Sequence, residues 1–100
     1  MDKMVQQQLE EANKLIFVKR YSEAERKLDE VLATDDGRRE LIIHLRRIEL
    51  ASMLKKLDRI RSHYQKELKA GRDQSINETC LALVEQHGDM AVSYTHLTLP

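Results

Sequence analysis

Apolar residues recur at helical spacing in five stretches of this chain, and only two to six residues separate one stretch from the next. The single proline is Pro100, so the residue that most strongly interrupts a helix is absent from all five stretches. Before residue 92, no segment alternates polar and apolar residues over the length of a strand. Short connections favour antiparallel neighbours. The sequence therefore predicts an all-α fold of about five antiparallel helices, without a β-sheet.

Cap and turn residues predict where these helices begin and end. Ser22 followed by Glu25 has the spacing of a capping box, which opens a helix. Ser75 and Glu78 repeat that spacing, and Asp36 is a candidate cap for the third helix. With Gly71 and Gly88 as stop signals, the expected helices cover about residues 2–18, 22–33, 38–55, 59–70 and 75–87.

The third predicted helix is apolar on more than one side, because Ile43 and Leu50 broaden its stripe. A helix of this kind is expected to lie between others, so we place it at the centre of the fold. Its stripe consists of Leu41, Ile42, Leu45, Ile48, Ala51 and Leu54. The predicted core positions of the other helices are Val5, Leu9, Ala12, Leu15 and Ile16; Ala24, Leu28, Val31 and Leu32; Ile60, Tyr64 and Leu68; and Ile76, Cys80, Leu83 and Val84.

The composition is typical of a helix-rich soluble domain, with 41% hydrophobic and 34% charged residues. No stretch approaches the roughly 20 apolar residues of a membrane span, and the first residues lack the apolar core of a secretory signal. Cys80 is the only cysteine, which excludes an internal disulfide and a paired-cysteine metal site, and its apolar neighbours favour a buried thiol. We therefore expect a cytoplasmic protein.

Charge is unevenly spread along a chain whose net charge is zero. Residues 1–37 carry six Lys/Arg and nine Asp/Glu, residues 38–72 carry eleven and four, and residues 73–91 carry none and four. A basic middle segment can attract nucleic acid or an acidic partner. The alternative, which we favour, is that acidic neighbours in the fold offset the basic helices.

The run YSEAERKLDEVLATD at residues 21–35 resembles the second half of a tetratricopeptide repeat. Tyr21 stands at the aromatic turn position of that family, Ala24 at the small position and Leu28 at the large one. Ala12 falls where the family has a small residue in its first helix. The resemblance implies antiparallel helix pairs stacked as a short right-handed solenoid.

A second, degenerate copy begins 36 residues later, with Leu57 for the aromatic, Ile60 for the small residue and Tyr64 for the large one. A third begins at residues 81–90 (LALVEQHGDM). The departures from the family pattern include Glu11, which stands where an apolar residue is usual. Ile60 is another, since its bulk is expected to push the third and fourth helices apart.

The family resemblance implies a scaffold that binds another protein in a groove lined by the first helix of each pair. The alternative for the apolar residues Phe17 and Met53 is ordinary packing between neighbouring helices. In the family register, the groove positions are Leu9, Asn13, Ile16 and Phe17; Glu49, Ser52 and Met53; and Glu78, Ala82 and Glu85.

Enzymatic motifs are absent from the sequence: there is no GxSxG, no GKS or GKT loop and no HExxH. We therefore expect no catalytic residues, no cofactor and no metal. Glu40 and His44 share a helical face, but such a pair is common in charged helices.

Two other functions remain open at this stage. The first is a basic helical module that binds nucleic acid, although no exposed aromatic residues interleave with the cations for base stacking. The second is a helical secretion-type chaperone, a class that some tetratricopeptide proteins resemble.

Residues 92–100 (VSYTHLTLP) resemble the translation of a transposon-end sequencing adapter. We therefore expect residues 1–91 to be an N-terminal fragment of a helical-repeat protein and residues 92–100 to be a non-native tail.

Overall fold

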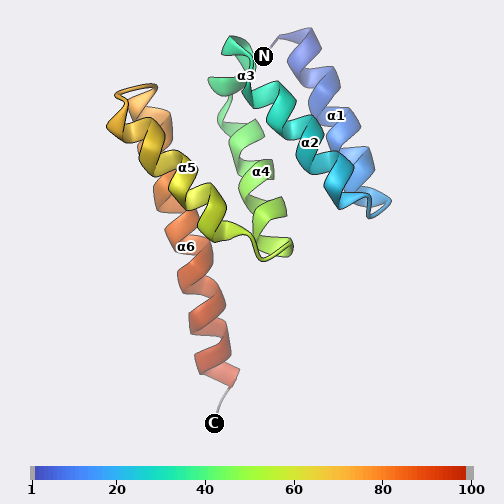
Figure 1. Cartoon of the computed structure of the whole chain (residues 1–100). Helices are drawn as coiled ribbons and strands as arrows, with labels where there is room; N and C mark the ends of the chain where they lie inside the picture. The colour runs from blue at the N-terminus through green and yellow to red at the C-terminus, as the bar shows by residue number, and fades with distance from the viewer. Residues whose placement is uncertain (1, 99–100) are drawn as a thin grey trace.

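The computed structural model describes the backbone of residues 2–98 and the side chains of residues 2–87. Its helices are α1 (Lys3–Phe17), α2 (Tyr21–Leu32), α3 (Asp35–Arg38), α4 (Leu41–Met53), α5 (Leu57–Lys69) and α6 (Gln74–Thr98) (Figure 1). No strand occurs between residues 2 and 98, so the all-α prediction is confirmed for that part of the chain.

The extra helix relative to the prediction is α3, a single turn between α2 and α4. Thr34 caps it: the hydroxyl oxygen accepts from the N–H of Gly37 at 3.0 Å and donates to the carbonyl of Val31 at 2.6 Å. Asp36 was predicted to cap a long third helix, but it lies inside this turn. The long helix α4 begins at Leu41 with Glu40 at its N-cap, because the Thr34 hydroxyl starts the separate turn α3 directly after α2.

Two other boundary predictions were wrong. Ser22 and Ser75 each lie one residue inside a helix rather than at its N-cap, since α2 begins at Tyr21 and α6 at Gln74. Gly88 does not end a helix, because α6 continues to Thr98. A glycine inside a helix costs only about 1 kcal/mol, so it stops the helix only where the chain turns into the left-handed conformation.

Helices α1, α4 and α5 end in the same backbone turn. In this Schellman motif, the first and second N–H groups after the C-cap bond to carbonyls three and five residues earlier. The left-handed residue is Lys19 after α1 (φ 65°), Lys55 after α4 (φ 59°) and Gly71 after α5 (φ 73°). Because Lys19 and Lys55 are 36 residues apart, the α1–α2 and α4–α5 hairpins share one register.

The core consists of two clusters with α4 between them, which confirms its predicted central position. Leu41 differs from the prediction, since this first residue of α4 is 40% exposed. The first cluster contains Val5, Ala12, Ala24, Leu28, Val31, Ile43 and Leu50. The second contains Ile48, Ala51, Ile60, Tyr64, Cys80 and Val84.

The two hairpins differ in how closely their helices lie together. Helices α1 and α2 are in extensive contact, whereas α5 packs mainly on α6 and touches α4 less (Figure 1). The difference agrees with the bulk at Ile60, which is buried where the first hairpin has Ala24. Helix α4 lies between α2 and α5 and contacts both (Figure 1).

Candidate protein-binding surface

The positions predicted to line a partner groove are spread between the core and the surface. Leu9 and Ile16 are half-buried and pack against the first core cluster. Glu49 is half-buried and pairs with Arg46 at 2.8 Å within α4. The remaining half-buried positions are Asn13 and Ser52, and the exposed ones are Phe17, Met53, Glu78, Ala82 and Glu85.

Phe17 and Met53 are the exposed apolar members of that set. The side chain of Phe17 is 87% exposed and that of Met53 is 54% exposed. Each is the last residue of its helix, in α1 and α4, and the two are 36 residues apart. Packing between neighbouring helices therefore does not account for either of them.

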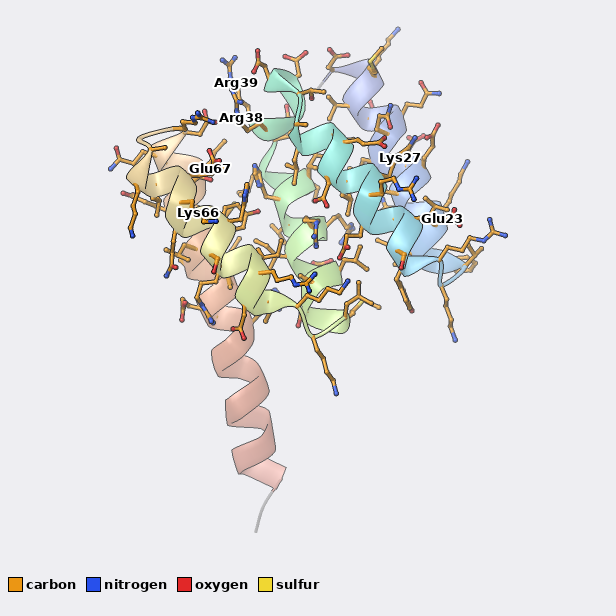
Figure 2. All side chains as sticks on the ribbon, in the orientation of Figure 1. Glu23, Lys27, Arg38, Arg39, Lys66 and Glu67 are labelled. Atoms are coloured by element: carbon orange, nitrogen blue, oxygen red, sulfur yellow. The ribbon has the colours of Figure 1, made fainter. Side chains whose placement is uncertain are left out.

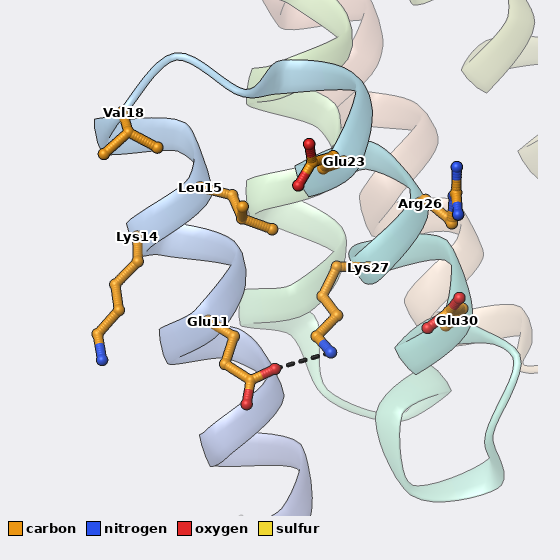
Figure 3. A pocket seen from close by; sticks show the side chains of 8 residues that line it. All are labelled: Glu11, Lys14, Leu15, Val18, Glu23, Arg26, Lys27 and Glu30. Carbon is orange, nitrogen blue, oxygen red and sulfur yellow. Dashed lines mark ion pairs between the residues drawn. The ribbon is translucent and has the colours of Figure 1, made fainter.

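A wide groove of about 730 Å³ lies between α1 and α2 on the side away from α4 (Figure 3). Leu15 and Val18 supply its apolar surface, and Val18 is 58% exposed. An ion pair crosses the groove from Lys27 Nζ to Glu11 Oε2 at 2.7 Å (Figure 3). The other lining residues are Lys14, Glu23, Arg26 and Glu30.

A second hollow, of about 390 Å³, is lined by residues of α2, α4 and α5. Arg47 from α4 lies in it at 8% exposure, and its Nε donates to Asp29 of α2 at 2.7 Å. Arg59 and His63 of α5 form the opposite side. The hollow is thus bounded by charged groups from three helices.

Ion pairs neutralise much of the positive charge of the basic segment, residues 38–72. Of the eight Lys and Arg residues from Arg38 to Arg61, which we call the clustered cations, five pair with carboxylates: Arg38, Arg46, Arg47, Lys56 and Arg61. Most of these carboxylates come from the acidic segments on either side, such as Asp29, Asp73 and Glu85. Arg38 and Arg39 lie together at the end of α3 (Figure 2), and Arg38 reaches Asp73 at 2.7 Å.

A buried polar contact joins α4 to α5. His44 Nδ1 lies 2.9 Å from the hydroxyl of Tyr64, and His44 Nε2 lies 2.7 Å from the carbonyl oxygen of Arg38. Because a carbonyl only accepts, Nε2 carries the proton and Nδ1 accepts from Tyr64. Burial lowers the pKa of His44 and raises that of Tyr64, so both stay neutral near pH 7.

Cys80 is fully buried, and burial raises the pKa of its thiol to about 11. That agrees with the prediction of a core residue rather than a reactive thiol. No group of three or more His, Cys, Asp or Glu side chains converges as a metal site in the described residues. Glu40 and His44 therefore form no such cluster there.

The α1–α2 groove was missed by the sequence analysis. The available signal was Glu11, which departs from the family pattern at a position where the next hairpin has the buried residue Arg47. Charge alone could not have identified the groove, because Glu11 is 43% exposed whereas Arg47, which is also charged, is buried against α2.

A comparison of the chain with protein-family models, with curated proteins and with solved structures gives no match. The tetratricopeptide resemblance therefore depends on the residues of this chain alone. No helix in the described part combines the length and apolar character that a membrane span needs.

Proposed function

We propose that this chain is a helical-repeat module, similar to tetratricopeptide arrays, that binds another protein and acts as a cytoplasmic scaffold. The observation that carries the proposal is the exposure of Phe17 at 87% and of its repeat equivalent Met53 at 54%. Single exposed apolar residues are common on protein surfaces. Large ones at the same place in two successive hairpins are more informative, because aromatic and Met side chains are enriched where proteins bind one another.

The charge distribution supports protein binding over nucleic-acid binding. A phosphate-binding surface needs clustered cations that are free to neutralise phosphates. Here five of eight clustered cations already face carboxylates, and Arg47, the most buried, pairs with Asp29 and Glu25.

The test is affinity capture on the immobilised chain, compared with the double variant Phe17→Ser/Met53→Ser. Met4→Ser is the matched control, because Met4 is 69% exposed at the other end of α1. We expect a protein that the wild type and Met4→Ser retain and that the double variant loses. An identical set of captured proteins for all three chains, or capture that nuclease treatment abolishes, would refute the proposal.

A further inference from the structure

The surface of the α1–α2 groove has a counterpart in the α4–α5 hairpin. With the 36-residue register, Glu11 corresponds to Arg47, Val18 to Leu54 and Lys27 to His63. The other lining residues Lys14, Leu15, Glu23, Arg26 and Glu30 correspond to Leu50, Ala51, Arg59, Ser62 and Lys66. The groove is therefore the first hairpin's copy of a face that the second hairpin also has.

On the second hairpin, helix α2 covers the α4 side of this face, whereas the α5 residues Arg59, Ser62, His63 and Lys66 are exposed. Arg47 pairs with Asp29 of α2 at 2.7 Å and with Glu25 of α2 at 3.4 Å. Lys56, at the hairpin loop, reaches Glu25 at 3.6 Å. Leu50 lies in the first core cluster, which includes residues of α2. The chain thus shows how a helix docks on a face of this kind.

On the first hairpin, the same face is open to solvent. Val18 is 58% exposed, whereas its counterpart Leu54 packs against the first core cluster. The Glu11 side chain is 43% exposed, whereas Arg47 is buried. No helix in the described part of the chain takes the position on α1–α2 that α2 takes on α4–α5 (Figure 1).

We propose that the α1–α2 groove binds an amphipathic helix of a partner protein, in the position that α2 occupies on the next hairpin. The proposal rests on the protein-binding function proposed above and names the surface and the kind of partner. The groove residues from Glu11 to Val18 extend about 12 Å along α1, which matches roughly two turns of a docked helix.

Charge complementarity specifies the partner helix further. Where α2 presents the carboxylates of Glu25 and Asp29 to Arg47, the groove presents the carboxylate of Glu11. The partner helix therefore carries Lys or Arg at the positions that face Glu11. The lining as a whole is mixed, because Lys14, Arg26 and Lys27 stand beside Glu11, Glu23 and Glu30. Glu11 can accept from a second cation while it stays paired with Lys27, because an ionised carboxylate has two acceptor oxygens.

A synthetic probe tests this without a known partner. It is a stapled, fluorescein-labelled peptide of residues 20–34 in which Glu25→Arg and Asp29→Arg reverse the charges that face the groove. Fluorescence anisotropy against the full chain should show saturable binding. Glu11→Arg should weaken it roughly tenfold, because it replaces an attractive pair by a repulsive one. Glu10→Arg, on an exposed neighbour outside the groove, should not change it.

Two further measurements separate the groove from a general charge effect. The peptide without the two substitutions should bind Glu11→Arg better than it binds the wild type, which is a charge-reversal rescue. Val18→Ser should weaken the binding of both peptides, because it removes apolar surface from the groove without adding a charge. Absence of saturable binding to the wild type, or equal loss in Glu10→Arg and Glu11→Arg, would overturn the proposal.

The capture experiment distinguishes this inference from the proposed function. Suppose that the Phe17→Ser/Met53→Ser variant fails to capture a protein that the wild type captures. If the Glu11→Arg variant still captures that protein, and the peptide probe does not displace it, the groove proposal fails while the proposed function stands. If no protein is lost by that variant while the probe binds as described, the proposed function fails alone. A dimer in sedimentation that Glu11→Arg dissociates would overturn the partner assignment, since the occupant would then be a second copy of this chain.

Discussion

At the scale of single residues, the turns that end α1, α4 and α5 each need one residue in the left-handed conformation. Glycine is the residue that adopts this conformation most easily, and only one of the three turns has it. Gly71 has the side chain best suited to its φ of 73°, whereas Lys19 and Lys55 adopt φ of 65° and 59° with a Cβ. A non-glycine residue in this region costs about 1 kcal/mol or more. Glycine would therefore be less strained than lysine at residues 19 and 55.

We predict that Lys19→Gly and Lys55→Gly each raise the free energy of unfolding, by about 0.5–1 kcal/mol. Gly71→Ala is the control in the opposite direction. It should lower the free energy of unfolding by about 1 kcal/mol because of the φ of 73° alone, since no atom within 4 Å would clash with the added Cβ. Urea unfolding measures all three. A loss of stability in both lysine variants would contradict the assignment of these turns.

Gly37 presents a different requirement, which is space rather than backbone conformation. It is buried in α3, and an added Cβ would overlap the carbonyl oxygen and the side chain of Val31. Because a backbone oxygen cannot move without shifting the end of α2, we predict that Gly37→Ala lowers the free energy of unfolding by about 2 kcal/mol or more. The same urea titration checks it, and a neutral result would show that α3 can move away from α2.

At the scale of helices, the His44–Tyr64 hydrogen bond holds α5 where its contact with α4 is otherwise sparse. Tyr64→Phe would leave His44 Nδ1 buried without a donor, so we predict a loss of about 1–3 kcal/mol in the free energy of unfolding. Tyr21→Phe is the control, because the hydroxyl of this half-buried residue makes no hydrogen bond within residues 2–87. Equal losses in the two variants would contradict the role of the bond.

The same histidine predicts how stability depends on pH. Burial lowers the pKa of His44 below its ordinary value of 6.5, although the Arg38 carbonyl and Asp73 oppose that shift and nearby His63 adds to it. The unfolded chain therefore takes up this proton first as the pH falls through 6.5, and the folded state loses stability. We expect the free energy of unfolding to decrease from about pH 7.5 to about pH 5.5, and His44→Gln to flatten that decrease. His63→Gln should weaken the decrease much less than His44→Gln does, because burial is the largest cause of the shift in the His44 pKa and His63 only adds to it. A wild-type chain whose stability rises on acidification would contradict the assignment.

At the scale of the whole molecule, ion pairs between distant segments join the first hairpin to the rest. Arg47 on α4 reaches two carboxylates on α2, and its side chain is only 10% exposed. Arg46, its neighbour, pairs only within α4 and is 38% exposed. The uneven charge along the sequence is thereby largely balanced in space.

We predict that Arg47→Met lowers the free energy of unfolding by about 1–3 kcal/mol, because Asp29 loses its cation and the half-buried carboxylate of Glu25 keeps only Lys56, at 3.6 Å. Arg46→Met is the matched control and should cost less than about 0.5 kcal/mol, since an exposed pair within one helix is screened by water. Thermal unfolding followed by circular dichroism measures both. Similar losses in the two variants would show that Arg47 does not link the hairpins.

The sequence by itself determined the helices, most of the buried positions and the 36-residue spacing. Helical periodicity depends on residues within a turn or two of one another, so Ala12, Leu28, Tyr64 and Val84 were recognisable as core positions without any tertiary information. The central position of α4 followed from its apolar residues on two sides, for the same reason.

Only the tertiary structure decided which faces the hairpins cover and which they leave open. The partners of Arg47 lie 18 and 22 residues away in the sequence, and the exposure of Val18 and Phe17 depends on which side of α1 the described helices leave uncovered. No local pattern encodes these features, because they follow from how whole helices pack. The same repeated face is thus covered on its α4 side in the second hairpin and is open on α1 in the first.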